Sequence, residues 1–186
     1  MSANLLAKAV AAALEQARIS YMVVGSFSSN LYGLPRSTKD ADFVVELGDQ
    51  SISSIMPFLD DGFKLDPQMR LESVTGTCRY VMTHTATQFK VEFFLLTNDA
   101  FDQSRFTRRR KGLLDGQQVF VPTAEDVLIQ KILWAKRGHR AKDREDALHV
   151  LEVMTPEALD LPYIHRWCDT HGTRDLLEQL ISEIQT

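Results

Sequence analysis

Cysteine is scarce in this sequence. Among its 186 residues there are only Cys78 and Cys168, which lie far apart and form no CxxC pair. This spacing argues against a zinc site, a redox motif and a secreted disulfide scaffold. A reducing compartment fits such a chain, so we expect a cytoplasmic protein.

Long apolar runs are missing as well. Lys8, Glu15 and Arg18 interrupt the apolar stretch near the first residue. No run approaches the roughly 20 apolar residues that a membrane span needs. We therefore expect no signal peptide, no anchor and no membrane partner.

The sequence also has no excess of basic residues. The formal net charge is -4, so RNA or DNA would have to contact a local patch. The first basic cluster comprises Arg105, Arg108, Arg109, Arg110 and Lys111, and the second comprises Lys136, Arg137, His139, Arg140, Lys142 and Arg144. Taken alone, the run 108–110 is more typical of a solvated loop than of an RNA contact.

The composition that is present, 44% hydrophobic and 25% charged, is that of an ordered globular protein. Hydrophobic periodicity predicts helices first and strands next. The helices are expected at 4–18, 26–33, 52–59, 123–134 and 142–153, with two more after Pro156 and Gly172. The strands are expected at 20–24, 40–46 and 118–121 and through most of 63–96, most clearly at 79–83 and 89–96.

This order of elements predicts an α/β (α+β) fold with a mixed sheet and flanking helices. Residues 1–121 would form the α/β core, and residues 122–186 a small helical C-terminal part packed on it.

Two aspartates dominate the chemistry that the sequence offers. Asp40 and Asp42 are separated by one residue at the start of an expected strand, so both side chains emerge on one face. Two carboxylates that share a site raise the pKa of one of them, and a bound divalent cation reverses that penalty. The pair therefore predicts a metal site.

Two further features complete a possible site. Glu92 lies in a strand of mostly apolar residues, where a carboxylate needs a partner or a metal, and is the candidate third ligand. Gly25 and Ser26 follow the strand 20–24. Glycine lets the backbone approach a phosphate closely, and the amides that begin the next helix can donate to an anion.

In this order, the motifs resemble the nucleotidyltransferase superfamily. Its pattern is a hydrophobic residue, Gly and Gly or Ser, then a gap, then Asp-x-Asp, then a third Asp or Glu on a later strand. Here the gap is 27–39. The resemblance implies that Asp40, Asp42 and Glu92 are catalytic and hold Mg²⁺ or Mn²⁺, while Gly25 and Ser26 bind the triphosphate.

More narrowly, the stretches 33–40, 126–131 and 142–146 are similar to bacterial nucleotidyltransferase-like proteins related to the abortive-infection toxins of toxin–antitoxin systems. This resemblance implies nucleotide-site roles for Lys131 and for an acid at Asp143 or Asp146. Arg36 and Thr38, in the first of these stretches, are further nucleotide-site candidates, although Arg36 could instead pair with an acid and Thr38 could cap a turn. The chain departs from the common pattern in having serine at position 26 and glutamate at 92, and the longer Glu92 side chain shifts its carboxylate by about one methylene.

The predicted activity is metal-dependent transfer of a nucleoside monophosphate from a triphosphate such as ATP to an acceptor hydroxyl. An RNA 3′ end, a protein hydroxyl and a small molecule such as an aminoglycoside all present the same nucleophile, and the resemblance favours RNA, particularly tRNA. Two alternatives stay open: a nucleotide- or RNA-binding module without activity, and a toxin–antitoxin component that acts by binding a cognate partner protein.

Simpler interpretations exist for individual residues. Asp40 and Asp42 could form a surface turn, and Glu92 could point outward from an edge strand beside Lys90. Lys131 could occupy the end of a helix, where the helix dipole favours a cation. The acids at 143 and 146 could pair with the arginines at 140 and 144.

Overall fold

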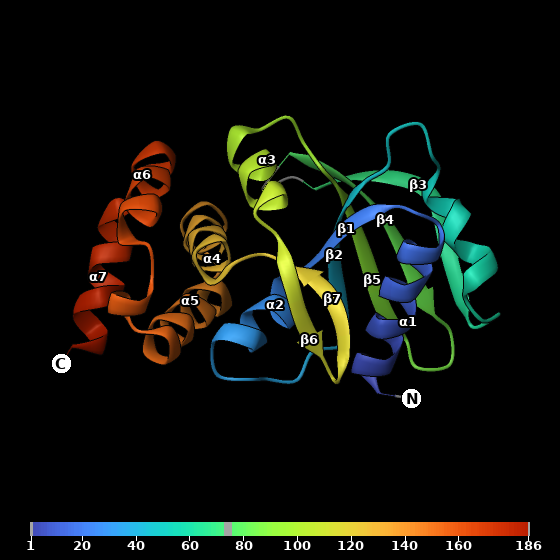
Figure 1. Ribbon diagram of the computed structural model, residues 1–186, viewed down its shortest axis with the longest axis horizontal. Coiled ribbons are helices and arrows are strands. Elements are labelled where there is room, and N and C mark those ends of the chain that lie inside the picture. Colours follow the sequence, from blue (N-terminus) through green and yellow to red (C-terminus); the bar gives the residue numbers. More distant parts are fainter. Residues whose placement is uncertain (1, 73–75, 186) are drawn as a thin grey trace. The chain divides into compact units, whose positions relative to one another are not determined.

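The structure, a computed structural model, describes residues 2–72 and 76–185 (Figure 1). Residues 73–75, which belong to the predicted strand-rich stretch 63–96, lie outside the described residues. The chain divides into two compact units. The sheet unit consists of Met1–Phe27 and Ser37–Val121, and the helical unit of Ser28–Arg36 and Pro122–Thr186. The chain thus divides after residue 121, but a short segment, 28–36, belongs with the C-terminal helices. The predicted packing of the helical part on the core stays a prediction.

A five-stranded mixed sheet forms the centre of the sheet unit. Its strand order is β1-β2-β5-β4-β3; β2 and β5 run parallel, and the other neighbours are antiparallel. The strands are β1 (Ser20–Val24), β2 (Asp40–Glu46), β3 (Phe63–Glu72), β4 (Thr77–His84) and β5 (Phe89–Leu95). The predicted strands are present, and β5 is the central one.

The two faces of this sheet differ in character. The helix α1 (Ala3–Gln16) covers the face that carries the main core (Figure 1). Because side chains alternate along a strand, Ala41, Phe43 and Val45 enter this core while Asp40 and Asp42 lie on the opposite face. That second face has a smaller apolar cluster: Met22, Val24, Val44, Phe94 and Phe106.

Two helices of the sheet unit differ from the sequence prediction. The expected α-helix at 52–59 is the 3₁₀-helix η1 (Ile52–Phe58), which contains Pro57 and buries Ile52 and Ile55. A side-chain spacing of three suits a 3₁₀ turn, and proline cannot donate the hydrogen bond that continues an α-helix. The helix α3 (Ala100–Thr107) was not predicted.

A hairpin of β6 (Arg110–Leu114) and β7 (Gln117–Val121) ends the sheet unit. Asp115 and Gly116 connect its strands with φ angles of 49° and 81°. Positive φ at both central residues is the geometry of a type I′ turn, for which Asp-Gly is a favoured pair. Only β7 was predicted.

The helical unit follows the predicted pattern. The helix α2 (Gly25–Tyr32) begins in the sheet unit and continues into this one. Four long helices follow: α4 (Ala124–Gly138), α5 (Ala141–Met154), α6 (Leu161–His171) and α7 (Arg174–Ile184), with the short η2 (Pro156–Ala158) between α5 and α6. As predicted, Thr123 caps α4.

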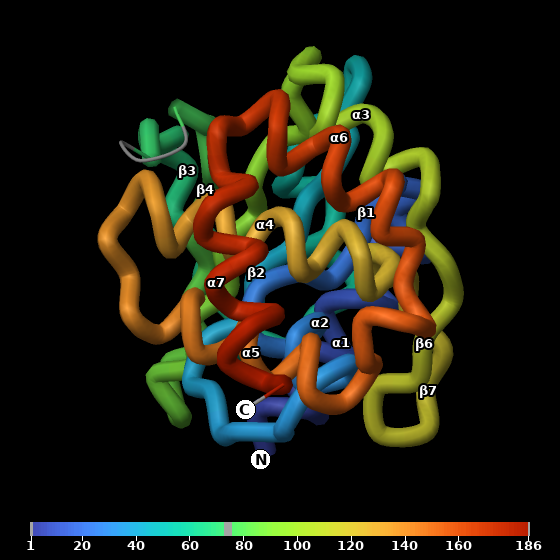
Figure 2. The backbone as a smooth tube through the Cα atoms, turned by 90° about the vertical axis from the view of Figure 1, so that its left-hand side faces the viewer, coloured from blue at the N-terminus to red at the C-terminus, as the bar shows by residue number. Residues whose placement is uncertain are grey.

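The helices of this unit pack in pairs: α4 contacts α5 and α6, and α5 contacts α7 (Figure 2). Across residues 2–72 and 76–185, no helix combines the length and the apolarity that crossing a membrane requires.

Candidate functional site

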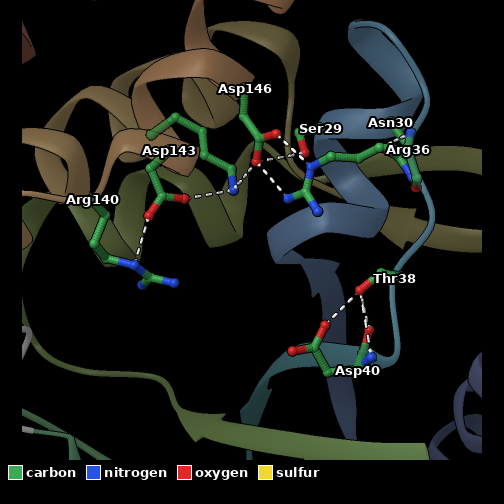
Figure 3. Close-up of polar contacts among 9 residues, drawn as sticks. Ser29, Asn30, Arg36, Thr38, Asp40, Arg140, Asp143 and Asp146 are labelled. Atoms are coloured by element: carbon green, nitrogen blue, oxygen red, sulfur yellow. Dashed lines mark hydrogen bonds and ion pairs between the residues drawn. The ribbon is translucent and has the colours of Figure 1, made fainter.

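The β2 acids stand on the face of the sheet opposite the main core. The hydroxyl of Thr38 donates to Oδ1 of Asp40 at 2.5 Å, and both residues are drawn in Figure 3. The same hydroxyl lies 3.1 Å from the Asp40 carbonyl oxygen. Thr38, a predicted nucleotide-binding residue, therefore fixes the orientation of the first metal-ligand candidate.

Glu92 is brought beside this pair by strand register. In the parallel β2–β5 ladder, Asp42 is the partner of Glu92, and Asp40 is the partner of Lys90. Side chains at paired positions of a parallel ladder point to one face. Because β5 is central, the alternative that Glu92 lies on an edge strand is wrong.

Two cations contact Glu92. The ammonium of Lys90 lies 2.7 Å from Oε1, and Nε of Arg79 lies 3.2 Å from the same oxygen. The guanidinium of Arg79 also lies over the Phe94 ring, 5.7 Å from its centroid. Arg79 is a site residue that the sequence did not indicate, because its place beside Glu92 depends on the register of β4 on β5.

Gly25 is required at its position by two independent constraints. Its φ is 64°, a left-handed conformation that residues with a side chain rarely adopt. A Cβ at residue 25 would also lie 2.1 Å from Oδ2 of Asp42. The glycine therefore lets the Asp42 carboxylate lie against the backbone where α2 begins, and the next residue, Ser26, is buried.

The donor set suits an open metal site. Within the described residues, no three or more His, Cys, Asp or Glu side chains are grouped so that they could hold a metal ion. Mg²⁺, however, commonly binds through one or two carboxylates together with substrate phosphates and water. Asp40 and Asp42, with Gly25 leaving room beside them, fit that arrangement, while Glu92 is engaged by cations.

The four other predicted nucleotide-site residues form a network inside the helical unit (Figure 3). The buried ammonium of Lys131 lies 2.8 Å from Oδ1 of Asp143 and 2.7 Å from Oδ2 of Asp146. Arg36 donates to both oxygens of Asp146, from Nε at 2.8 Å and from Nη2 at 2.9 Å. Ser29, also in this unit, donates to Asp146 at 3.4 Å.

These contacts correct two interpretations of the sequence. Lys131 does not end a helix, because α4 continues to Gly138 and ends with His139 in a left-handed conformation. Asp143 does pair with Arg140, at 3.0 Å. Asp146 instead pairs with Arg36 and Lys131, and Arg144 pairs with Glu183.

The surroundings of Asp146 lower its pKa. Burial alone would raise it, but the hydrogen bonds from Arg36 and the charge and hydrogen bond of Lys131 outweigh burial and bring the pKa from 3.8 to about 2. The carboxylate is therefore ionised at any physiological pH and acts as a fixed anion inside the unit.

Several residues of the two basic clusters make contacts within their own units. In the second cluster, Lys136 pairs with Asp175 at 2.7 Å, and Arg144 pairs with Glu183. In the first, Arg105 pairs with Asp102 at 2.8 Å, and Arg109 stacks on Phe106, 4.1 Å from the ring centroid. The solvated-loop interpretation of 108–110 is wrong at its end, because Arg110 begins β6.

The five-stranded mixed sheet with flanking helices is a nucleotidyltransferase-like fold, which confirms the predicted fold class. No protein-family model matches the chain. No curated protein matches it in sequence.

Solved structures show the likeness in detail. The antibiotic-resistance factor ANT(2'')-Ia aligns with a TM-score of 0.63 at 10% identity, covering 95% of this chain and 94% of that one. Its complex with adenylyl-2''-tobramycin aligns at 0.61 and 11% identity, covering 92% and 97%. An antigenic nucleotidyltransferase-like protein from Paracoccidioides brasiliensis aligns at 0.59 and 17% identity, covering 97% and 92%. At these low sequence identities the likeness shows the fold alone.

Proposed function

We propose that this protein is a metal-dependent nucleotidyltransferase that moves a nucleoside monophosphate from a nucleoside triphosphate to an acceptor hydroxyl. The observation that carries the proposal is the placement of Asp40 and Asp42 on one face of β2, where Gly25 has no side chain and so leaves space for the Asp42 carboxylate. This arrangement occurs in a nucleotidyltransferase-like fold.

In the proposed reaction, the acceptor oxygen attacks the α-phosphorus. The bond from that phosphorus to the bridging oxygen breaks, pyrophosphate leaves, and the hydroxyl proton passes to solvent. Asp40, Asp42 and Glu92 would hold Mg²⁺ or Mn²⁺, and Gly25 and Ser26 would direct backbone amides at the phosphates. The bound ion would lower the pKa of the attacking hydroxyl and neutralise the leaving oxygens.

The network of the helical unit has a supporting role in this proposal. Lys131, Asp143 and Asp146 are buried and satisfied by one another. Arg36, anchored on Asp146, keeps 28% of its side chain exposed. Arg36 stays a candidate for nucleotide contact on the resemblance of its motif, and we assign the orientation of its guanidinium to the three buried residues.

The acceptor that we propose is a small molecule bearing a hydroxyl. RNA, which the sequence resemblance favoured, would need basic charge that is not already neutralised. Lys136 and Arg144 of the second basic cluster are paired with acids of α7. The neighbour ANT(2'')-Ia is known in complex with adenylyl-2''-tobramycin, an adenylylated small molecule.

A transfer assay tests the function. The purified protein is incubated with Mg²⁺ and each labelled nucleoside triphosphate, with aminoglycosides, total RNA or total protein as acceptor. The Asp40→Ala, Asp42→Ala double variant is compared with an Asp49→Ala, Asp61→Ala control, which removes the same charge from exposed positions.

Label transfer that needs the metal and is lost only in the first variant supports the proposal, and the labelled fraction identifies the acceptor. Transfer to RNA would restore the RNA acceptor. Absence of transfer from every triphosphate, with triphosphate binding intact, would favour a binding module, and co-purification of a small partner protein would favour the toxin–antitoxin alternative.

A further inference from the structure

Glu92 shares one oxygen, Oε1, between two cations, and this sharing bears on how the proposed metal site fills. Lys90 Nζ lies 2.7 Å from that oxygen and Arg79 Nε lies 3.2 Å from it. Any divalent ion that uses this oxygen would therefore meet two positive charges at contact distance. This oxygen can accept the ion only if at least one of them withdraws.

The two cations differ in how firmly they are held. The Arg79 side chain is 24% exposed and stacks on Phe94, so both the ion pair with Glu92 and the ring contact hold it in place. The Lys90 side chain is 46% exposed. Its flexible aliphatic stem can change rotamer, which moves the ammonium at a small cost in free energy. Of the two, Lys90 is the cation able to move.

Strand register gives Lys90 a second acid within its surroundings. Lys90 is the ladder partner of Asp40, just as Glu92 is the partner of Asp42. Lys90 thus lies on the same face of the sheet as Asp40 and Asp42, where a phosphate bound to the proposed metal would also lie. Lysine is a common phosphate ligand because its point charge accepts many geometries.

We propose that Lys90 is an exchangeable counter-ion of the site: it competes with the divalent ion for Glu92 and contacts a phosphate once the ion has displaced it. This inference rests on the proposed function. It requires Lys90 to change two affinities in opposite directions. Lys90 should weaken binding of the bare ion and strengthen binding of an ion–triphosphate complex.

The test measures binding of Mn²⁺ alone and of Mn²⁺–tripolyphosphate, which carries the phosphates that all nucleoside triphosphates share, by calorimetry. Lys90→Met keeps most of the stem and removes the charge. We expect it to tighten Mn²⁺ binding and to weaken Mn²⁺–tripolyphosphate binding, each by about threefold to fivefold, as for removal of a half-exposed ion pair. Lys90→Arg should largely keep the affinity for Mn²⁺–tripolyphosphate, because it retains the positive charge.

The control is Lys64→Met. Lys64 is the partner of Thr83 on β4, and Thr83 is the partner of Lys90 on β5, so the same charge is removed from the same face two strands away. We expect neither affinity to change by as much as about twofold, because a distant exposed charge is screened by salt.

Asp42→Asn separates the two proposals. If Asp42→Asn weakens Mn²⁺ binding while Lys90→Met leaves both affinities unchanged, or shifts both the same way, the counter-ion role is wrong and the metal site stands. If Asp42→Asn has no effect on Mn²⁺ binding, the metal site itself is wrong and the inference falls with it.

Discussion

Charged side chains gather in two places in this protein, and the two differ in burial and in charge balance. On the sheet, Asp40, Asp42 and Glu92 are partly exposed, and two cations face them. In the helical unit, Asp143 and Asp146 are buried, and three cations pair with them: Lys131, Arg36 and Arg140. The two buried acids of the helical unit thus pair with three cations, whereas on the partly exposed sheet the two cations contact Glu92.

In our proposal, this contrast separates a site that binds a divalent ion from a network that already contains its cations. Neighbouring carboxylates become favourable when a divalent ion joins them, so the proposed site would serve ligand binding rather than folding. A buried and satisfied network is costly to break, because the charges left behind cannot be hydrated. Substitutions at the two places should therefore act on different measurements.

The largest effect is expected at Asp42. Asp42→Asn keeps the shape of the side chain but removes the charge that would hold the ion, so transfer activity should fall by about 10³-fold, which corresponds to about 4 kcal/mol. Its melting temperature should stay within a few degrees of the unsubstituted protein. Steady-state rates and thermal unfolding measure the two quantities. A loss of stability in proportion to activity would break the comparison, since it would make this acid structural.

Next comes Lys131. Lys131→Met leaves two buried carboxylates with one cation fewer, and unfolding free energy should fall by about 3 kcal/mol. The matched control is Lys136→Met on the same helix, whose pair with Asp175 is largely exposed and should contribute less than about 1 kcal/mol. Urea unfolding of both variants measures the difference. Equal losses of unfolding free energy in the two variants would show that the buried ion pairs of Lys131 stabilise the protein no more than the exposed pair of Lys136.

A third test concerns Gly25. Gly25→Ala should cost about 2 kcal/mol of stability and also weaken Mn²⁺ binding, because its Cβ would displace the Asp42 carboxylate. Gly48→Ala separates the two causes: its φ is similarly positive, at 54°, but no atom lies within 4 Å of the added carbon. That control should lose about 1 kcal/mol and keep its Mn²⁺ affinity. If both variants bind Mn²⁺ equally well, Gly25 serves the turn alone.

The sheet site could be predicted from sequence to a much greater extent than the helical network. A spacing of two places Asp40 and Asp42 on one face, and a glycine after a short strand marks a turn, so local rules were sufficient. The pairing of Arg36 with Asp146 joins residues 110 positions apart, and no local pattern encodes it. Only the narrower family resemblance singled out both residues, and it did not say that they touch.

Other omissions have similar physical causes. Lys131 was placed at a helix end because the periodic apolar residues stop near Trp134, whereas the helix continues on polar residues to Gly138. The strand β6 is half exposed and rich in basic residues, so it carries no alternating pattern. Arg79 needed the exact register of β4 on β5, which the turn between them sets and composition does not.

The effect expected from pH is no larger than that of Gly25→Ala. The folded pKa of Asp146 is about 2, against 3.8 for a free aspartate. A lowered pKa contributes stability that is complete above about pH 4 and is lost as pH falls towards 2, which amounts to about 2 kcal/mol. The unfolding free energy of the unsubstituted protein and of Asp146→Asn should therefore converge as pH falls through this window. An Asp49→Asn control should run parallel to the unsubstituted protein, since Asp49 is exposed. If the gap between Asp146→Asn and the unsubstituted protein stayed constant from pH 5 to pH 2, the ion pairs of Arg36 and Lys131 would not be what stabilises this carboxylate, and the contrast between the closed network and the open site would rest on packing alone.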